Sequence, residues 1–214
     1  MQKFFLLLLL TSIWRVALAA EVQVELRTVE DQAMPNAVIY LTAKQSLPSS
    51  APQTIAIMDQ INRQFSPHVL AVQKDTQVRF PNSDSIKHHV YSFSAAKRFE
   101  LQLYKGLNAN PLLFNTSGVV ELGCNIHDWM LGYVIVLDTP YFAKTDGAGK
   151  VSFTLPEGEY RLNIWHPRIA QSPESLEYAV NIRESNNLSY RLDKPLLVDL
   201  NQYEAVPADV NDYE

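Results

Sequence analysis

Short segments in which apolar and polar residues alternate recur along the chain. Clear examples are residues 22–26, 77–80, 99–103 and 151–155. Because successive side chains of a β-strand point to opposite faces of a sheet, strict alternation indicates a strand with one buried face. Stretches rich in Gly, Pro, Asn and Ser separate these segments and predict loops, among them residues 105–115 and a linker at 46–52. The sequence therefore predicts an all-β fold.

Residues 1–19 are typical of a secretory signal peptide. Lys3 gives the segment a positive start, residues 4–10 are all apolar, and Ala17-Leu18-Ala19 supplies a small-x-small cleavage site. Arg15 interrupts the apolar stretch, which is too short to span a bilayer. We therefore expect an exported, periplasmic protein with no membrane span in its mature form.

The charge balance and the cysteine content narrow the range of partners. The formal net charge is −5, and it becomes −7 without the signal segment because Lys3 and Arg15 are lost. An acidic surface argues against binding to nucleic acid or to an anionic membrane.

The chain has one cysteine, Cys124, so it cannot form an internal disulfide. An unpaired thiol in an oxidising compartment is a liability unless a ligand occupies it.

A compact set of soft metal-binding side chains surrounds that cysteine. Cys124, His127 and Met130 follow one another at intervals of three residues, and His88 and His89 lie upstream in a strand-like run. A thiolate, imidazoles and a thioether suit copper better than a hard cation. Only one of two adjacent strand histidines can face the ion, and we expect His88.

Other interpretations of these residues remain open at this point. A single Cys is often a small buried hydrophobic residue, and a nearby Met is often core filler. Zinc fits less well, since structural zinc sites favour several Cys or His ligands and rarely a thioether. A dinuclear copper centre would need a second cysteine.

The motif resembles a known family. The Cys-x2-His-x2-Met loop, followed by the strand-like residues 131–136, resembles the C-terminal copper loop of the cupredoxins, with the short amicyanin-like spacing. Residues 88–90 (His-His-Val) resemble the His-Asn-Val of that family, with His88 in the ligand position and His89 in place of Asn. The resemblance implies one type 1 (blue) copper ion, Cu(I)/Cu(II), bound by His88, Cys124, His127 and Met130. The positions expected around these ligands are His89, Asn82, Asp128 and Trp129.

The resemblance also divides the chain. Residues 54–138 have the length and strand number of a cupredoxin Greek-key sandwich. The pattern T-D-x2-G-x5-L-P-x-G-x-Y-x-L, which begins at Thr145, resembles the second half of a carboxypeptidase regulatory-like, transthyretin-like β-sandwich of carbohydrate-binding-like fold. We assign residues 20–46 and 139–198 to this second sandwich. The cupredoxin would then be inserted in it, the alternative being two tandem sandwiches with a separate N-terminal hairpin. Residues 199–214 are expected to form a flexible acidic tail.

The leading functional hypothesis is electron transfer between periplasmic redox proteins. The two-part arrangement resembles the cupredoxin-containing methylamine utilization proteins, a label that does not establish a role in methylamine metabolism. No paired carboxylates, catalytic triad, phosphate loop or second metal cluster emerges, so we do not expect an enzyme. The alternative is a copper-binding or adhesion module in which copper is structural or sensory and the second sandwich contacts a glycan or a protein. A copper chaperone would favour an exposed, Met-rich site. Of the remaining histidines, we expect His166 to be exposed.

Overall fold

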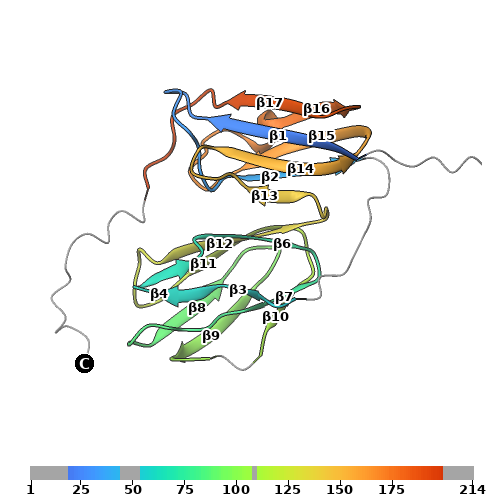
Figure 1. Ribbon diagram of the computed structural model, residues 1–214. Helices are drawn as coiled ribbons and strands as arrows, with labels where there is room; N and C mark the ends of the chain where they lie inside the picture. Colours follow the sequence, from blue (N-terminus) through green and yellow to red (C-terminus); the bar gives the residue numbers. More distant parts are fainter. Residues whose placement is uncertain (1–18, 44–53, 108–109, 200–214) are drawn as a thin grey trace, which may run out of the picture.

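The computed structural model describes residues 19–43, 54–107 and 110–199 (Figure 1). Within these residues the regular elements are β-strands and one short 3₁₀ helix, η1 (Pro173–Leu176), which confirms the predicted all-β fold. The described part contains no helix that is long and apolar enough to cross a membrane. The predicted signal segment up to residue 18, the predicted linker 46–52 and the predicted tail beyond Asp199 lie outside the described residues.

Two sheets, which we term the outer pair, lie at the top of Figure 1. The first has the order β14-β1-β17, with β1 antiparallel to β14 and parallel to β17. The second has the order β13-β2-β15-β16. Their alternating patterns place Val22, Val24 and Leu26 of β1 in one core with Leu41 and Leu162. The strands are β1 (Ala19–Arg27), β2 (Val38–Ala43), β13 (Phe142–Lys144), β14 (Lys150–Pro156), β15 (Gly158–Trp165), β16 (Glu177–Ile182) and β17 (Asn186–Arg191).

Strands β1 and β2 are neighbours in sequence but lie in different sheets. Among the described strands, their partners all follow residue 141: β1 pairs with β14 and β17, and β2 with β13 and β15. Residues 54–138 are therefore placed, along the chain, between two consecutive strands of one sheet, β2 and β13.

Two further sheets, which we term the inner pair, lie below the outer pair in Figure 1. They have the orders β6-β12-β11-β8-β9 and β10-β7-β3, and a small hairpin, β4–β5, accompanies them. Phe65, Phe80, Phe114 and Leu122 are buried in their common core. The strands are β3 (Ala56–Ile57), β4 (Asp59–Ile61), β5 (Gln64–Ser66), β6 (Val69–Gln73), β7 (Thr76–Arg79), β8 (His88–Ser92), β9 (Phe99–Tyr104), β10 (Leu112–Phe114), β11 (Gly118–Gly123) and β12 (Leu131–Leu137).

The two pairs of sheets meet over one edge of the five-stranded sheet. Val38 of β2 packs with Val69 of β6 and with Ile135 and Leu137 of β12. The ammonium group of Lys144 in β13 donates a hydrogen bond to the carbonyl of Val69 at 3.1 Å. This contact covers β6 and β12. Strands β8 and β11, which carry the candidate ligands, lie farther from the junction in the same sheet.

One predicted loop was wrong. Residues 105–115 were predicted to be a loop, but they contain β10, which pairs with β7. Residues 64–73 form two strands, β5 and β6, because Pro67 cannot donate to a β-ladder and interrupts the pairing. Asn186 and Asn187 begin β17, where they pair with β1.

Candidate metal centre

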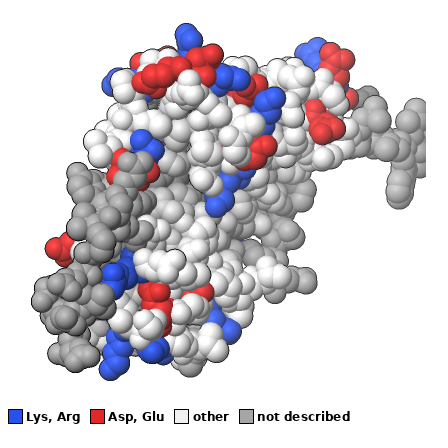
Figure 2. Space-filling view, turned by 60° about the vertical axis from the view of Figure 1, so that its left-hand side comes forward, with Lys and Arg blue, Asp and Glu red and all other residues white. Residues whose placement is uncertain are grey.

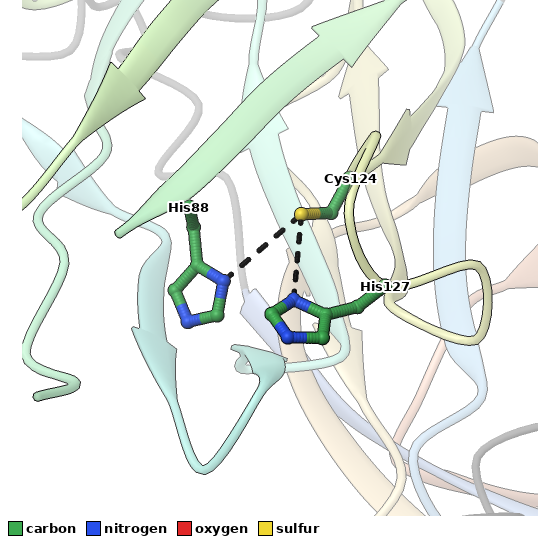
Figure 3. A group of neighbouring side chains, drawn as sticks. All are labelled: His88, Cys124 and His127. Carbon is green, nitrogen blue, oxygen red and sulfur yellow. Dashed lines mark hydrogen bonds between the residues drawn. The ribbon is translucent and has the colours of Figure 1, made fainter. Parts of the chain in front are cut away.

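Three side chains converge at one end of the inner pair of sheets. The metal-binding atoms of His88, Cys124 and His127 all lie within 4.8 Å of one another. The Cys124 sulfur is 4.0 Å from Nδ1 of His88 and 3.7 Å from Nδ1 of His127 (Figure 3). All three are buried, with exposed fractions of 0%, 3% and 7% in sequence order. Among the described residues, this is the group of His, Cys, Asp and Glu side chains arranged to hold a metal ion.

The pairing of β8 with β11 brings these side chains together. Strand β8 begins at His88 and runs antiparallel to β11, with Tyr91 opposite Gly123, the residue before Cys124. A Cβ atom at Gly123 would lie 2.7 Å from the ring and hydroxyl of Tyr91. The absence of a side chain at Gly123 therefore leaves room for the Tyr91 ring to lie over β11, next to Cys124.

The loop from Cys124 to β12 folds back on itself. The Met130 N–H donates to the His127 carbonyl at 2.9 Å, and the Leu131 N–H donates to the Trp129 carbonyl at 3.0 Å. These bonds make a tight turn that directs the His127 ring toward Cys124, as Figure 3 shows. Spacing of three residues in the sequence thus becomes proximity of two metal-binding atoms in space.

The electrostatics of the site favour a thiolate. Burial raises the pKa of the Cys124 thiol, but the His88 ring and the backbone N–H groups of His89 and Ile126 outweigh burial and lower the pKa below its ordinary value. Burial lowers the pKa of His88, but its contacts with Cys124 and Asp84 outweigh burial and raise it. The pKa of His127 is lowered, first by burial and then by the positive charge of His88. A thiolate is the form of cysteine that binds metals.

The second nitrogen of His88 is also engaged. Nε2 of His88 lies 2.6 Å from Oδ2 of Asp84. Burial raises the pKa of Asp84, but hydrogen bonds from the Arg63 backbone and from His88 outweigh burial and lower it. Because an ionised carboxylate can only accept, Nε2 carries the ring proton in the neutral imidazole and Nδ1 presents its lone pair toward Cys124.

The donor set fits a single metal ion. Zinc binds nitrogen at about 2.0–2.1 Å and sulfur at about 2.3 Å, and three ligands in a plane around an ion with such bonds place sulfur and nitrogen about 3.8 Å apart. The two separations from Cys124 are 3.7 and 4.0 Å. The geometry thus admits one ion between the three side chains, and the soft donors favour copper over a hard cation.

Met130 is fully buried and belongs to the same hydrophobic core as Cys124. It directly precedes β12, after the turn that presents His127. Its assignment as the axial ligand remains a prediction.

His89 lies outside the cluster. Its Nε2 is 2.9 Å from the Glu100 carboxylate, and its ring contacts Tyr91, two residues on and therefore on the same face of β8. The two adjacent histidines thus point to opposite faces, and His88 is the one that approaches Cys124. The His89 backbone N–H nevertheless donates to the Cys124 sulfur.

The other residues predicted to surround the site differ in their placement. Asn82 is buried and donates from its side chain to the carbonyls of Ile86 and Tyr104 at 3.0 and 2.8 Å. Trp129 is half-buried, and its ring centroid lies 5.3 Å from that of His127. Asp128 is exposed.

Sequence reasoning missed Asp84. The residue stands four positions before His88, in the loop that follows Phe80. That spacing alone does not show that its carboxylate reaches the imidazole, because the loop conformation decides this.

Of three comparisons with known proteins, the one with solved structures found matches. No protein-family model matches the sequence, and no curated protein matches it. The copper-containing nitrite reductase NirK from Thermus scotoductus SA-01 is 19% identical, with a TM-score of 0.37, over 44% of this chain and 25% of its own. A purple cupredoxin from Nitrosopumilus maritimus is 26% identical, with a TM-score of 0.32, over 38% and 99%. A reduced Cu(I) form of a mutant amicyanin is 21% identical, with a TM-score of 0.35, over 46% and 99%.

This chain thus spans a quarter of the length of the nitrite reductase and nearly the whole of the two smaller proteins. Because the TM-scores lie below 0.5, function has to be inferred from the side chains of the site. The solved structures to which the chain is similar include cupredoxins, the family that its Cys-x2-His-x2-Met loop resembles.

Proposed function

We propose that this protein is an exported type 1 copper protein that carries electrons between redox partners. His88, Cys124 and His127 would hold the copper ion in one plane, with Met130 as a weak axial ligand. The observation that carries the proposal is the convergence of two imidazole Nδ1 atoms on the only thiol of the chain, within 4.0 Å and in a buried position. When bound, copper would supply the one-electron Cu(I)/Cu(II) couple.

The side chains are suited to electron transfer because the surrounding structure fixes their positions. Gly123 pairs with Tyr91 of β8, the backbone bonds at Met130 and Leu131 close the loop, and the Asp84 carboxylate contacts the His88 ring. Little rearrangement is then needed between the two oxidation states. The three proposed ligands are at most 7% exposed, which leaves little room for a substrate at the metal and favours an electron carrier over an enzyme.

The loop end of the molecule is the proposed exit for electrons. Ile126 precedes His127 and is 43% exposed, and the half-buried Trp129 contacts the His127 ring. Ile86, two residues before His88, is also exposed. These apolar side chains suit a transient contact with a redox partner. Among the described residues on the face in Figure 2, charges of both signs are interspersed, so steering by a single sign of charge is not the basis of the proposal.

The test is a titration of the exported, metal-free protein with Cu(II). The proposal predicts an intense visible absorption that bleaches with ascorbate and disappears in Cys124→Ser. A colourless protein with tightly bound copper would contradict it and would favour a structural or sensory copper site. Export to the periplasm, and a glycan or protein contact of the outer pair of sheets, remain predictions.

A further inference from the structure

The Asp84 carboxylate connects a proposed copper ligand to a neighbouring hairpin. Its Oδ2 lies 2.6 Å from Nε2 of His88 and accepts the backbone N–H of Arg63 at 2.8 Å. Its Oδ1 accepts the backbone N–H of Asn62 at 2.6 Å. The His88 side chain is 0% exposed and that of Asp84 is 12% exposed. The carboxylate is thus held from two sides, by a hairpin turn and by the imidazole.

The hairpin adopts a conformation that turns its N–H groups toward Asp84. Asn62 and Arg63 are the two residues between β4 and β5, and their φ angles are +55° and +58°. Positive φ at both central positions is the pattern of a type I′ turn, in which glycine is favoured at the second position. Arg63 has a Cβ atom, so its backbone is strained in this left-handed region, where glycine would not be. Both strained residues donate to the same carboxylate, which stabilises the turn.

Further bonds fix the loop that carries Asp84. The Asp59 carboxylate of β4 accepts the hydroxyl of Ser83 at 2.7 Å, and the Ser83 N–H donates to the Gln60 carbonyl at 3.0 Å. The Asn82 side-chain oxygen accepts the Asp84 N–H at 3.0 Å. The carboxylate therefore has a fixed place in the structure, independent of its contact with His88.

We infer that Asp84 is a positioning residue that fixes the ring of His88 with Nδ1 toward Cys124 and strengthens it as a copper ligand, which lowers the reduction potential of the site. This inference rests on the proposed function. A carboxylate that accepts the other N–H of a ligating histidine sets its tautomer and raises its basicity. A more basic imidazole stabilises Cu(II) more than Cu(I), because Cu(II) has the higher charge. Removal of the carboxylate charge therefore favours reduction.

The test compares Asp84→Asn with Asp59→Asn. Both substitutions remove a carboxylate that braces the same hairpin and loop, but only Asp84 contacts His88. In Asp84→Asn we expect the visible band to persist and the affinity for Cu(II) to fall about 10–100-fold. With Cu(I) affinity unchanged, that loss raises the reduction potential by about 59–118 mV. Asp59→Asn should leave both quantities close to those of the wild type.

An unchanged potential in Asp84→Asn, or equal changes in the two variants, would overturn the inference and reduce Asp84 to a structural role. A second measurement needs neither copper nor a variant. In ¹⁵N NMR spectra of the metal-free protein at alkaline pH, the neutral His88 ring should carry its proton on Nε2; a proton on Nδ1 would refute the inference. A wild type without a blue band would contradict the proposed function alone, and the NMR result would still decide the role of Asp84.

Discussion

Acidification of the metal-free protein should weaken the junction between the two pairs of sheets through His166. This residue lines a cavity of about 750 Å³ that also borders His68 and Val69 of the inner pair. We expected His166 to be exposed, but it is half-buried there, with Nδ1 accepting the backbone N–H of Arg168 at 3.1 Å. Burial first, then the charges of His68 and Arg168, lower its pKa to about 4, and Asp199 only partly opposes them.

The sign and size of the effect follow from proton linkage. The pKa of His166 is about 4 in the folded chain and 6.5 at its ordinary value, so the unfolded chain binds more protons between these two limits. The contribution to the free energy of unfolding is therefore complete above pH 6.5 and is lost as the pH falls toward 4. A difference of about 2.5 pKa units corresponds to a loss of about 3 kcal/mol at pH 4.

Urea denaturation at pH 7 and pH 4, followed by tryptophan fluorescence, to which Trp165 at the junction contributes, measures this loss. The matched variant is His166→Asn, whose side-chain oxygen can still accept the Arg168 N–H but cannot titrate. The wild type should lose about 3 kcal/mol more than the variant between the two pH values, since all other titrating groups are common to both. Equal losses would show that His166 does not titrate as its surroundings require and would refute the reasoning.

Three further predictions concern the site and its support. His88→Ala should damage the visible absorption more than His89→Ala, because only the first ring approaches the thiol; the opposite order in copper titrations would show that the ligand was assigned wrongly. Gly132→Ala should lower the free energy of unfolding by about 1–3 kcal/mol in urea denaturation, because the new Cβ would lie 2.7 Å from Phe65. The control is Gly147→Ala, whose Cβ would have no atom within 4 Å and which should change the free energy of unfolding by less than about 0.5 kcal/mol. Loading with copper should raise the unfolding temperature in calorimetry, and a chelator should reverse the rise, because the ion binds the folded site; equal temperatures with and without copper would count against a preformed site.

Local patterns in the sequence predicted the parts of the site that depend on a few adjacent residues. Cys124 and His127, three residues apart in the sequence, lie in one turn with their side chains in contact. His88 and His89 are adjacent in a strand, so their rings lie on opposite faces of it. Alternation likewise identified β1, β7, β9 and β14. These features require no knowledge of distant contacts.

The parts that sequence reasoning missed depend on contacts between distant segments. Asp84 reaches His88 only because a hairpin some twenty residues earlier in the chain holds the loop. Strand β10 lies in a segment with few strand-forming residues and exists through its pairing with β7. His166 is half-buried because the two pairs of sheets meet beside it, and no property of its neighbours in sequence indicates that.

The position of β1 between β14 and β17 sets an order of assembly. Val22 pairs with Phe153 and with Asn186, so the first strand has no partner until more than a hundred further residues are available. The segment that contains the copper loop needs no strand from either end of the chain. This segment can fold while the rest of the chain is still being synthesised, whereas the outer pair of sheets can be completed only after β17 has been made. If β17 were removed by truncation, one edge of β1 would be open to pairing with another molecule. By covering that edge, β17 protects the protein from aggregation.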